Sequence, residues 1–299
     1  MKNVLLIASE AVPFIKTGGL ADVAGSLPKY FDKTKFDVRV MIPKYTCIPW
    51  EYREKMVYKT HFYIDLAWRT QYVGVFELEW NGVTFYFIDN EFYFGGNKPY
   101  SWIHEDIEKF AFFSKAALSA LPVLGFRPDI IHCNDWQTAL VPVYYYLFYS
   151  HRPWYYNIKS LFTIHNIQYQ GEYGWEVNTE CVGIPASETK ILEMNGKLNM
   201  MKGAIETATR VSTVSPSYAA EIKDPWFSWG LHDELNLRHY KLCGIKNGID
   251  TESYNPETDY QLYRNYSKDD MSGKGECKRA LQERLCLEQR WDVPLVGMV

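Results

Sequence analysis

Residues 3–25 read NVLLIASEAVPFIKTGGLADVAG, and this stretch carries the clearest signals of the fold. Its first part, Asn3–Ala8, is a short apolar run rich in branched side chains, the composition of a buried β-strand. Gly18 and Gly19 follow and open a helical pattern that continues to about Tyr30. A strand, a loop and a helix in succession form one unit of a parallel sheet covered by helices.

The same alternation continues along the chain. The clearest helix is predicted over His104–Leu121, where apolar side chains recur at helical spacing on one face. Further short apolar runs, each expected to be a strand, are Val38–Ile42, Asp129–His132, Ser160–Ile164, Arg210–Val214 and Pro294–Val299. The pattern therefore predicts the α/β class with a parallel sheet.

One segment breaks the alternation. Tyr72–Glu79 and Val83–Ile88 are both strand-like, and Asn81-Gly82 lies between them. This dipeptide tolerates the positive φ angles of a tight type I′ turn. We therefore predict a β-hairpin insertion in the parallel core.

Composition limits the class of protein. The chain has 299 residues, 47% of them hydrophobic and 23% charged, which is typical of a globular protein and not of a disordered one. A net charge of −4 offers no basic surface for nucleic acid. No stretch reaches the roughly 20 apolar residues that a membrane-spanning helix needs. Glu10 ends the first apolar run too early for a signal peptide, so we expect a cytoplasmic protein.

The cysteines indicate no cross-links. No C-x-x-C pair occurs, so neither a zinc site nor a disulfide framework is predicted, and we expect buried, reduced thiols. The six are Cys47, Cys133, Cys181, Cys243, Cys277 and Cys286.

A polar stretch after residue 250 predicts a domain boundary. Residues 1–250 are expected to form the main domain. Residues 251–299 are expected to contain a linker, a short helix over Lys278–Leu287 and the last apolar strand.

The loop after the first strand is a candidate anion site. Gly18 and Gly19 would let backbone amides approach a phosphate, the following helix adds partial positive charge, and Lys16 adds a full charge. The sequence matches neither the Walker motif nor G-x-G-x-x-G. The alternative is a glycine turn with an exposed lysine.

Two further candidates follow other strands. Asp135 comes after the strand near Cys133, and His165 and Asn166 come after the strand that ends at Ile164. Ligands bind at this edge of open parallel sheets, so these residues and Lys16 are expected to converge on one crevice. Alternatively, Asp135 caps a helix and His165 is a core imidazole bonded to backbone.

No metalloprotease, hydrolase or metal-site motif is present. Several motifs in register instead resemble the bacterial glycogen synthase and plant starch synthase family: Ala8-Ser9-Glu10, Lys16–Val23, Asn134-Asp135-Trp136, Phe162–Asn166, Thr213–Tyr218 and Asn247–Asp250. The resemblance implies a GT-B glycosyltransferase, whose Rossmann-like sheet has helices on both faces. It also implies retaining transfer of glucose from ADP-glucose to the 4-hydroxyl of an α-1,4-glucan or maltooligosaccharide, without a metal or other cofactor.

The resemblance also implies roles for single residues. Lys16, Gly18 and Gly19 would bind the diphosphate end of ADP-glucose. His165 would lie beside the anomeric carbon, and Asp135 and Asn166 would orient the glucosyl unit. No second carboxylate near Asp135 is evident, which argues against the two-carboxylate chemistry of a retaining glycosidase.

Three segments depart from the family pattern and affect the expected acceptor contacts: Tyr93–Pro99, Gln170–Ile184 and Asp224–Leu231. Family members also continue beyond Val299 into a C-terminal nucleotide-binding domain, so this chain is expected to be inactive alone. The alternative is a non-catalytic glucan-binding or regulatory module derived from the same domain. A phosphate-binding oxidoreductase or hydrolase is a more distant alternative, disfavoured by the missing motifs.

Overall fold

The structure is a computed structural model that describes residues 1–101 and 103–298. It divides into two units, Met1–Asn247 and Gly248–Val299, which are described separately below.

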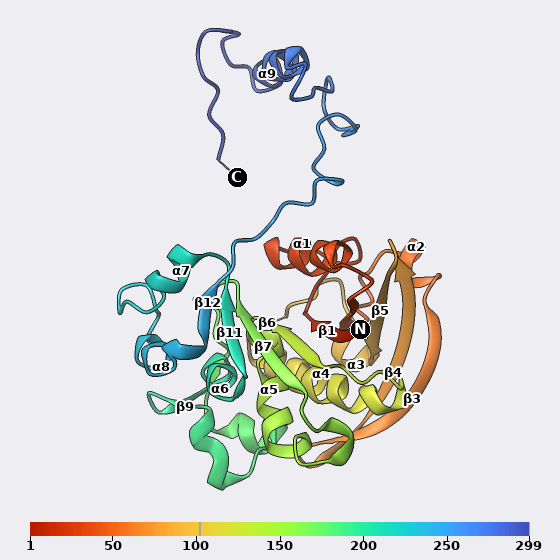
Figure 1. The fold of residues 1–299 in the computed structure, drawn as a ribbon, viewed down its shortest axis with the longest axis vertical. Coiled ribbons are helices and arrows are strands. Elements are labelled where there is room, and N and C mark those ends of the chain that lie inside the picture. Colours follow the sequence, from red (N-terminus) through yellow and green to blue (C-terminus); the bar gives the residue numbers. More distant parts are fainter. Residues whose placement is uncertain (102, 299) are drawn as a thin grey trace. The chain divides into compact units, whose positions relative to one another are not determined.

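In the described part of the chain, the first unit is built on a nine-stranded sheet with the order β12-β11-β7-β6-β1-β2-β5-β4-β3 (Figure 1). Every pairing from β12 to β5 is parallel, which confirms the predicted α/β class. The strands are β1 (Lys2–Ile7), β2 (Phe36–Pro43), β3 (Val57–Leu66), β4 (Arg69–Trp80), β5 (Val83–Asp89), β6 (Ile130–Asn134), β7 (Lys159–Ile164), β11 (Arg210–Thr213) and β12 (Leu242–Gly244).

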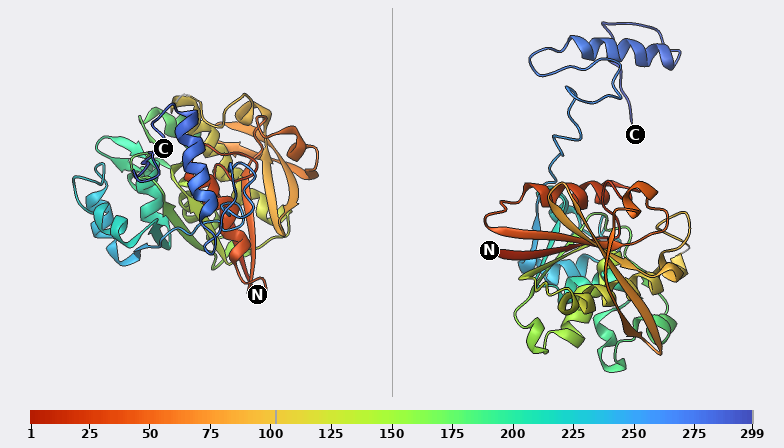
Figure 2. Two further views of the ribbon diagram at one scale, coloured as in Figure 1. Left: turned by 90° about the horizontal axis from the view of Figure 1, so that it is seen from above. Right: turned by 90° about the vertical axis from the view of Figure 1, so that its right-hand side faces the viewer.

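Helices cover the sheet on both faces, as expected for a Rossmann-like unit. Figures 1 and 2 show α1 on one side of the strands and α4 with α5 on the other. The helices of this unit are α1 (Gly19–Ser26), α2 (Trp50–Arg53), α3 (Glu91–Phe94), α4 (Ile103–Val123), α5 (Leu140–Tyr144), α6 (Met200–Thr207), α7 (Pro216–Glu221) and α8 (His232–Leu237).

The predicted hairpin is present and is larger than expected. Asn81 and Gly82 both have positive φ, 51° and 69°, as the type I′ turn requires. β5 pairs in parallel with β2, so the hairpin continues the main sheet. Antiparallel β3 was not foreseen and pairs with β4 at the edge of the sheet.

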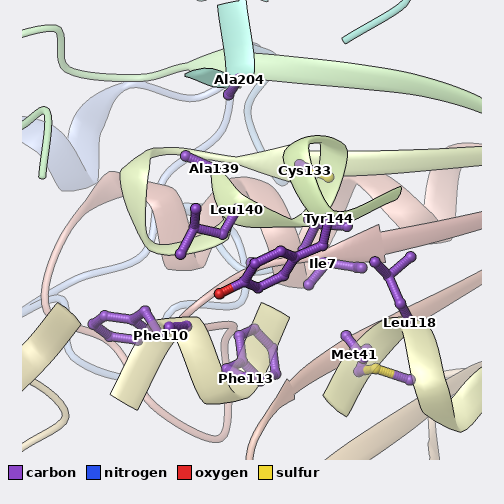
Figure 3. Packing of buried hydrophobic residues seen from close by; sticks show 14 of the residues in the cluster. Ile7, Met41, Phe110, Phe113, Leu118, Cys133, Ala139, Leu140, Tyr144 and Ala204 are labelled. Carbon is purple, nitrogen blue, oxygen red and sulfur yellow. The ribbon is translucent and has the colours of Figure 1, made fainter. Parts of the chain in front are cut away.

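The buried core includes a large cluster where α4 and α5 pack on the sheet. Figure 3 shows Tyr144 from α5 close to Phe110, Phe113 and Leu118 from α4 and to Ile7 from β1. All five side chains are buried. The Tyr144 hydroxyl donates to the Val182 carbonyl at 2.7 Å, so its burial leaves no polar group unpaired.

A small second sheet was also not foreseen. It has the order β8-β10-β9 in the described residues. Its strands are β8 (Glu172–Tyr173), β9 (Glu193–Met194) and β10 (Lys197–Asn199). Strands of two or three residues are too short to show the alternating pattern from which a strand is predicted.

The second unit contains α9 (Ser272–Arg284), which overlaps the predicted helix. The strand predicted at its end is wrong: residues 294–298 have no regular structure, and Val299 lies outside the described residues. A strand needs a neighbour for its backbone hydrogen bonds, and none of the described strands pairs with this segment.

The expectation about the cysteines holds in part. Cys133 and Cys181 are buried, whereas Cys243 and Cys286 are exposed, so the prediction of burial is wrong for the latter pair. All six thiols are free. Among the helices described, none is long and apolar enough to cross a membrane.

Candidate functional site

A cavity of about 860 Å³ lies where the parallel strands end. Its walls come mainly from the residues that follow β1, β6 and β7, the sheet edge at which ligands bind in this architecture. Five predicted site residues line it: Gly18, Gly19, Asp135, His165 and Asn166. Lys16 is not among the lining residues.

The glycine loop leaves open space above its backbone. Gly18 is the N-cap of α1, and a Cβ built on Gly18 or Gly19 would meet no atom within 4 Å. Neither a positive φ nor a lack of space for a side chain therefore requires glycine at these two positions. The open space leaves room for a ligand to approach the backbone amides.

Lys16 lies next to this loop and is half exposed. Its Nζ forms an ion pair with Asp22 at 2.8 Å. The predicted contact of Lys16 with a ligand therefore requires the ammonium to bridge to a ligand beside Asp22, or to leave this partner.

Glu10 is hydrogen-bonded to Thr17 of the glycine loop. It was not identified from the sequence as a site residue. Its carboxylate is buried and accepts hydrogen bonds from Thr17 twice, from the backbone N–H and, at 3.0 Å, from Oγ1. Burial raises the pKa of Glu10, while the two bonds from Thr17 oppose that rise. The triplet Ala8-Ser9-Glu10 was the signal in the sequence, but it does not reveal this contact.

Asp135 sits in a strained backbone conformation, with φ 56° and ψ 178°. Its Oδ1 accepts from the backbone N–H of His165 at 2.7 Å and of Asn166 at 3.4 Å. Asp135 does stand at the N-cap position before Trp136–Thr138, as the alternative interpretation predicts, but its side chain makes no capping bond. Burial raises the pKa of Asp135 to about 7, and the two N–H groups limit the rise.

His165 is bonded to a side chain and not, as the alternative interpretation held, to backbone. Its Nε2 lies 3.0 Å from Oδ1 of Asn134. Burial lowers the pKa of His165 to about 4, so the ring is neutral near pH 7.

Further side chains of the cavity were missed as functional. Gln137 lines the cavity, and its Oε1 is buried without a hydrogen-bond partner in the described part of the chain. Asp106 forms a buried ion pair with Lys109 at 2.8 Å and accepts from the Ser101 backbone N–H. The expectation of no second carboxylate near Asp135 is wrong, since Glu10 and Asp106 line the same cavity.

No group of three or more potential metal ligands occurs among the residues that the structure describes. The cavity instead offers backbone amides, a neutral imidazole and hydrogen-bonded carboxylates. These groups suit a ligand with many hydroxyls and a negatively charged end.

Fold and cavity together define an α/β protein with a cavity at the carboxyl ends of its parallel sheet. The starch synthase catalytic domain family matches residues 3–237, and the chain belongs to this family. It is 66% identical to a glycogen synthase of Lachnospira eligens and 51% identical to one of Lachnoclostridium phytofermentans, in each case over 100% of this chain and 63% of the relative. The chain thus spans less than two thirds of these relatives' length.

A solved structure agrees with this assignment. The catalytic domain of starch synthase IV from Arabidopsis thaliana, bound to ADP and acarbose, superposes with a TM-score of 0.82 at 31% identity. The match covers 96% of this chain and 60% of that chain.

Proposed function

We propose that this chain is the N-terminal part of a glycogen synthase, which transfers glucose from ADP-glucose to the 4-hydroxyl of an α-1,4-glucan with retention of configuration. The observation that carries the proposal is the meeting of the open glycine loop with Asp135 and His165 on one cavity. The names of the relatives and the ADP in the neighbouring structure support the choice of donor and acceptor.

The glycine loop would bind the diphosphate. The amides of Gly18 and Gly19 stand at the N-terminus of α1, where the helix dipole favours negative charge. Glu10 fixes the loop through Thr17. These amides would hold the diphosphate in the bound donor and in the ADP that leaves, so they would contribute mainly to donor binding.

The strand ends would bind the glucosyl unit. His165 and Asn166 would lie beside the sugar, and Asp135 holds both of their backbone N–H groups. A neutral His165 can hydrogen-bond a sugar hydroxyl without repelling the positive charge that develops on the ring in the transition state.

Three other carboxylates line the cavity, and two of them, Glu10 and Asp106, are already engaged; the third, Glu172, accepts at Oε1 from Nδ2 of Asn199 at 3.4 Å. Both oxygens of Glu10 accept from Thr17, and Asp106 is paired with Lys109. Neither is placed as the attacking carboxylate of a retaining glycosidase. Positioning and electrostatics therefore account for catalysis in the proposal, with no metal or other cofactor.

The nucleotide-binding domain would lie in the part of the relatives that this chain does not span. Residues 1–299 alone should therefore transfer glucose negligibly. We also propose a cytoplasmic location, on the ground that Glu10 interrupts the first apolar run.

A chimera tests the proposal. Residues 1–299 are joined to the remaining C-terminal part of the Lachnospira eligens glycogen synthase, and transfer of labelled glucose from ADP-glucose to glycogen is measured. The chimera should be active, the chain alone inactive, and UDP-glucose a poorer donor. An inactive but folded chimera, beside an active L. eligens enzyme, would contradict the proposal and favour a non-catalytic glucan-binding module.

A further inference from the structure

Asn134 lies at the end of β6 and is almost fully buried, with 1% of its surface exposed. Its Nδ2 donates to the carbonyl of Ile7 at 3.0 Å and to that of His132 at 3.3 Å. Its Oδ1 faces Nε2 of His165 at 3.0 Å. Every polar atom of the amide therefore has a partner.

These partners decide which way the amide points. Carbonyl oxygens only accept hydrogen bonds, so the atom facing Ile7 and His132 must be the NH₂ group. The flipped amide would place an oxygen against two carbonyl oxygens in a buried site, at the cost of unpaired polar atoms. Oδ1 must therefore face His165 and accept.

The protonation of the His165 ring follows from this orientation. An oxygen that can only accept requires a proton on Nε2. The ring is neutral near pH 7, because burial lowers the pKa of His165 to about 4. A neutral ring with a proton on Nε2 has a lone pair on Nδ1.

Nδ1 is available to a ligand. It has no hydrogen-bond partner within residues 1–101 and 103–298, and His165 lines the cavity. A lone pair accepts from a hydroxyl, the group that a sugar offers most often.

We propose that Asn134 is a positioning residue: it holds His165 in the Nε2–H tautomer, so that Nδ1 can accept a hydrogen bond from a ligand hydroxyl. That the hydroxyl belongs to a glucosyl unit rests on the proposed function. The tautomer itself does not.

The backbone of Asp135 makes this arrangement possible. Adjacent residues of a regular strand point to opposite faces, yet Asn134 and Asp135 both bind His165. The positive φ of Asp135, 56°, turns its carboxylate to the His165 backbone N–H. The side chain of Asn134 meanwhile faces the His165 ring. Two consecutive side chains thus hold both the backbone and the imidazole of one residue.

Histidine NMR tests the proposal on the chain as it is. The chain is labelled with ¹⁵N-histidine, the His165 signals are assigned with a His165→Ala variant, and long-range ¹H–¹⁵N spectra are recorded at about pH 7, where an unperturbed histidine is largely neutral. We expect a protonated Nε2 and a bare Nδ1. A proton on Nδ1 in the unmodified chain would overturn the proposal.

A pair of variants separates positioning from general stability. Asn134→Ala removes the acceptor and should shift the tautomer ratio of His165 about tenfold toward Nδ1–H. Asn90→Ala is the control: Asn90 is also buried, and its Nδ2 donates to the Tyr72 carbonyl at 2.8 Å, away from the cavity. It should leave the His165 spectrum unchanged.

Three outcomes are decisive. A ratio within twofold of the parent in folded Asn134→Ala would contradict the proposal, and so would an equal shift in Asn90→Ala. If Asn134→Ala does not fold, the tautomer of His165 in the unmodified chain still tests the proposal, which a proton on Nδ1 would overturn. The spectra need no glucosyl transfer, so an inactive chimera would defeat the proposed function and leave the tautomer assignment standing.

Discussion

The two sides of the cavity hold their groups in opposite ways. On the loop side, Gly18 and Gly19 have open space around them, and Thr17 is tied to the core through Glu10. On the strand-end side, His165 is held at its backbone and at its ring by two adjacent side chains. The loop can adapt to a ligand, whereas the strand ends are preorganised before it arrives.

This difference predicts where a substitution acts. Changes at the strand ends should lower turnover, because preorganised groups stabilise the transition state. Changes in the loop should act more on binding of the donor. Kinetic measurements use the chimera.

His165→Ala should reduce kcat by about 10²–10³-fold, the cost of removing one preorganised hydrogen-bonding group, with a smaller change in KM for ADP-glucose. Steady-state kinetics with glycogen as acceptor measure both constants. His151→Ala, an exposed histidine outside the cavity wall, is the matched control. A rise in KM with kcat unchanged would mean that His165 contributes only to donor binding. The loop and the strand ends would then act in the same way.

Lys16→Gln should reduce kcat/KM for ADP-glucose by roughly ten- to a hundredfold, because a charge-assisted contact contributes about 1.5–3 kcal/mol. Asp22→Asn serves as the control, since it removes the partner of Lys16 and keeps the lysine charge. If Lys16→Gln stays within twofold of the parent, Lys16 makes no contact with the donor and the loop is only a structural turn.

Glu10→Gln should raise KM for ADP-glucose by about tenfold with a smaller change in kcat. The variant loses the charge in its hydrogen bonds to Thr17, and so loosens the loop. Glu51→Gln, an exposed glutamate, controls for the loss of charge alone. An equal fall in kcat with no effect on KM would show that the loop side is as preorganised for the transition state as the strand ends.

The stability of the chain alone should depend on pH through Asp135, on the strand-end side of the cavity. Burial raises the pKa of Asp135 to about 7 from an ordinary 3.8. Between these values the folded state keeps a proton that the unfolded state releases, so Asp135 lowers the free energy of unfolding as pH rises from about 4 to about 7.

Asp135→Asn removes this titration and keeps an oxygen for the His165 N–H. Its Tm relative to the parent should therefore increase over that pH range, by at least about 2 °C. Thermal unfolding of both proteins at several pH values measures the difference. A gap that shrinks as pH rises would mean that the folded state prefers the ionised Asp135.

Much of the site could be predicted because parallel strands end at one edge. Asp135 and His165 are 30 residues apart, yet β6 and β7 are neighbours and their ends adjoin. The strands themselves were visible as apolar runs. β3 was not, because its exposed face carries residues such as Tyr58 and Tyr63 and only its pairing with β4 marks it as a strand.

The contacts that hold the site could not be predicted. Glu10 and Thr17 meet only because the loop after β1 folds back on itself. If the strand continued regularly through Asp135, the side chains of Asn134 and Asp135 would point to opposite faces. The positive φ of Asp135 reverses that expectation, and no residue pattern announces a strained aspartate.

The α/β class, the hairpin turn at Asn81-Gly82 and the family could all be recognised from the sequence, since local periodicity, turn chemistry and ordered motifs need no long-range information. Three contacts depend on tertiary packing: Glu10 holds the glycine loop, the Asp135 carboxylate binds the backbone N–H of His165, and Asn134 faces the His165 ring. Hydrogen bonds between side chains depend on distances and angles that the whole packed core sets.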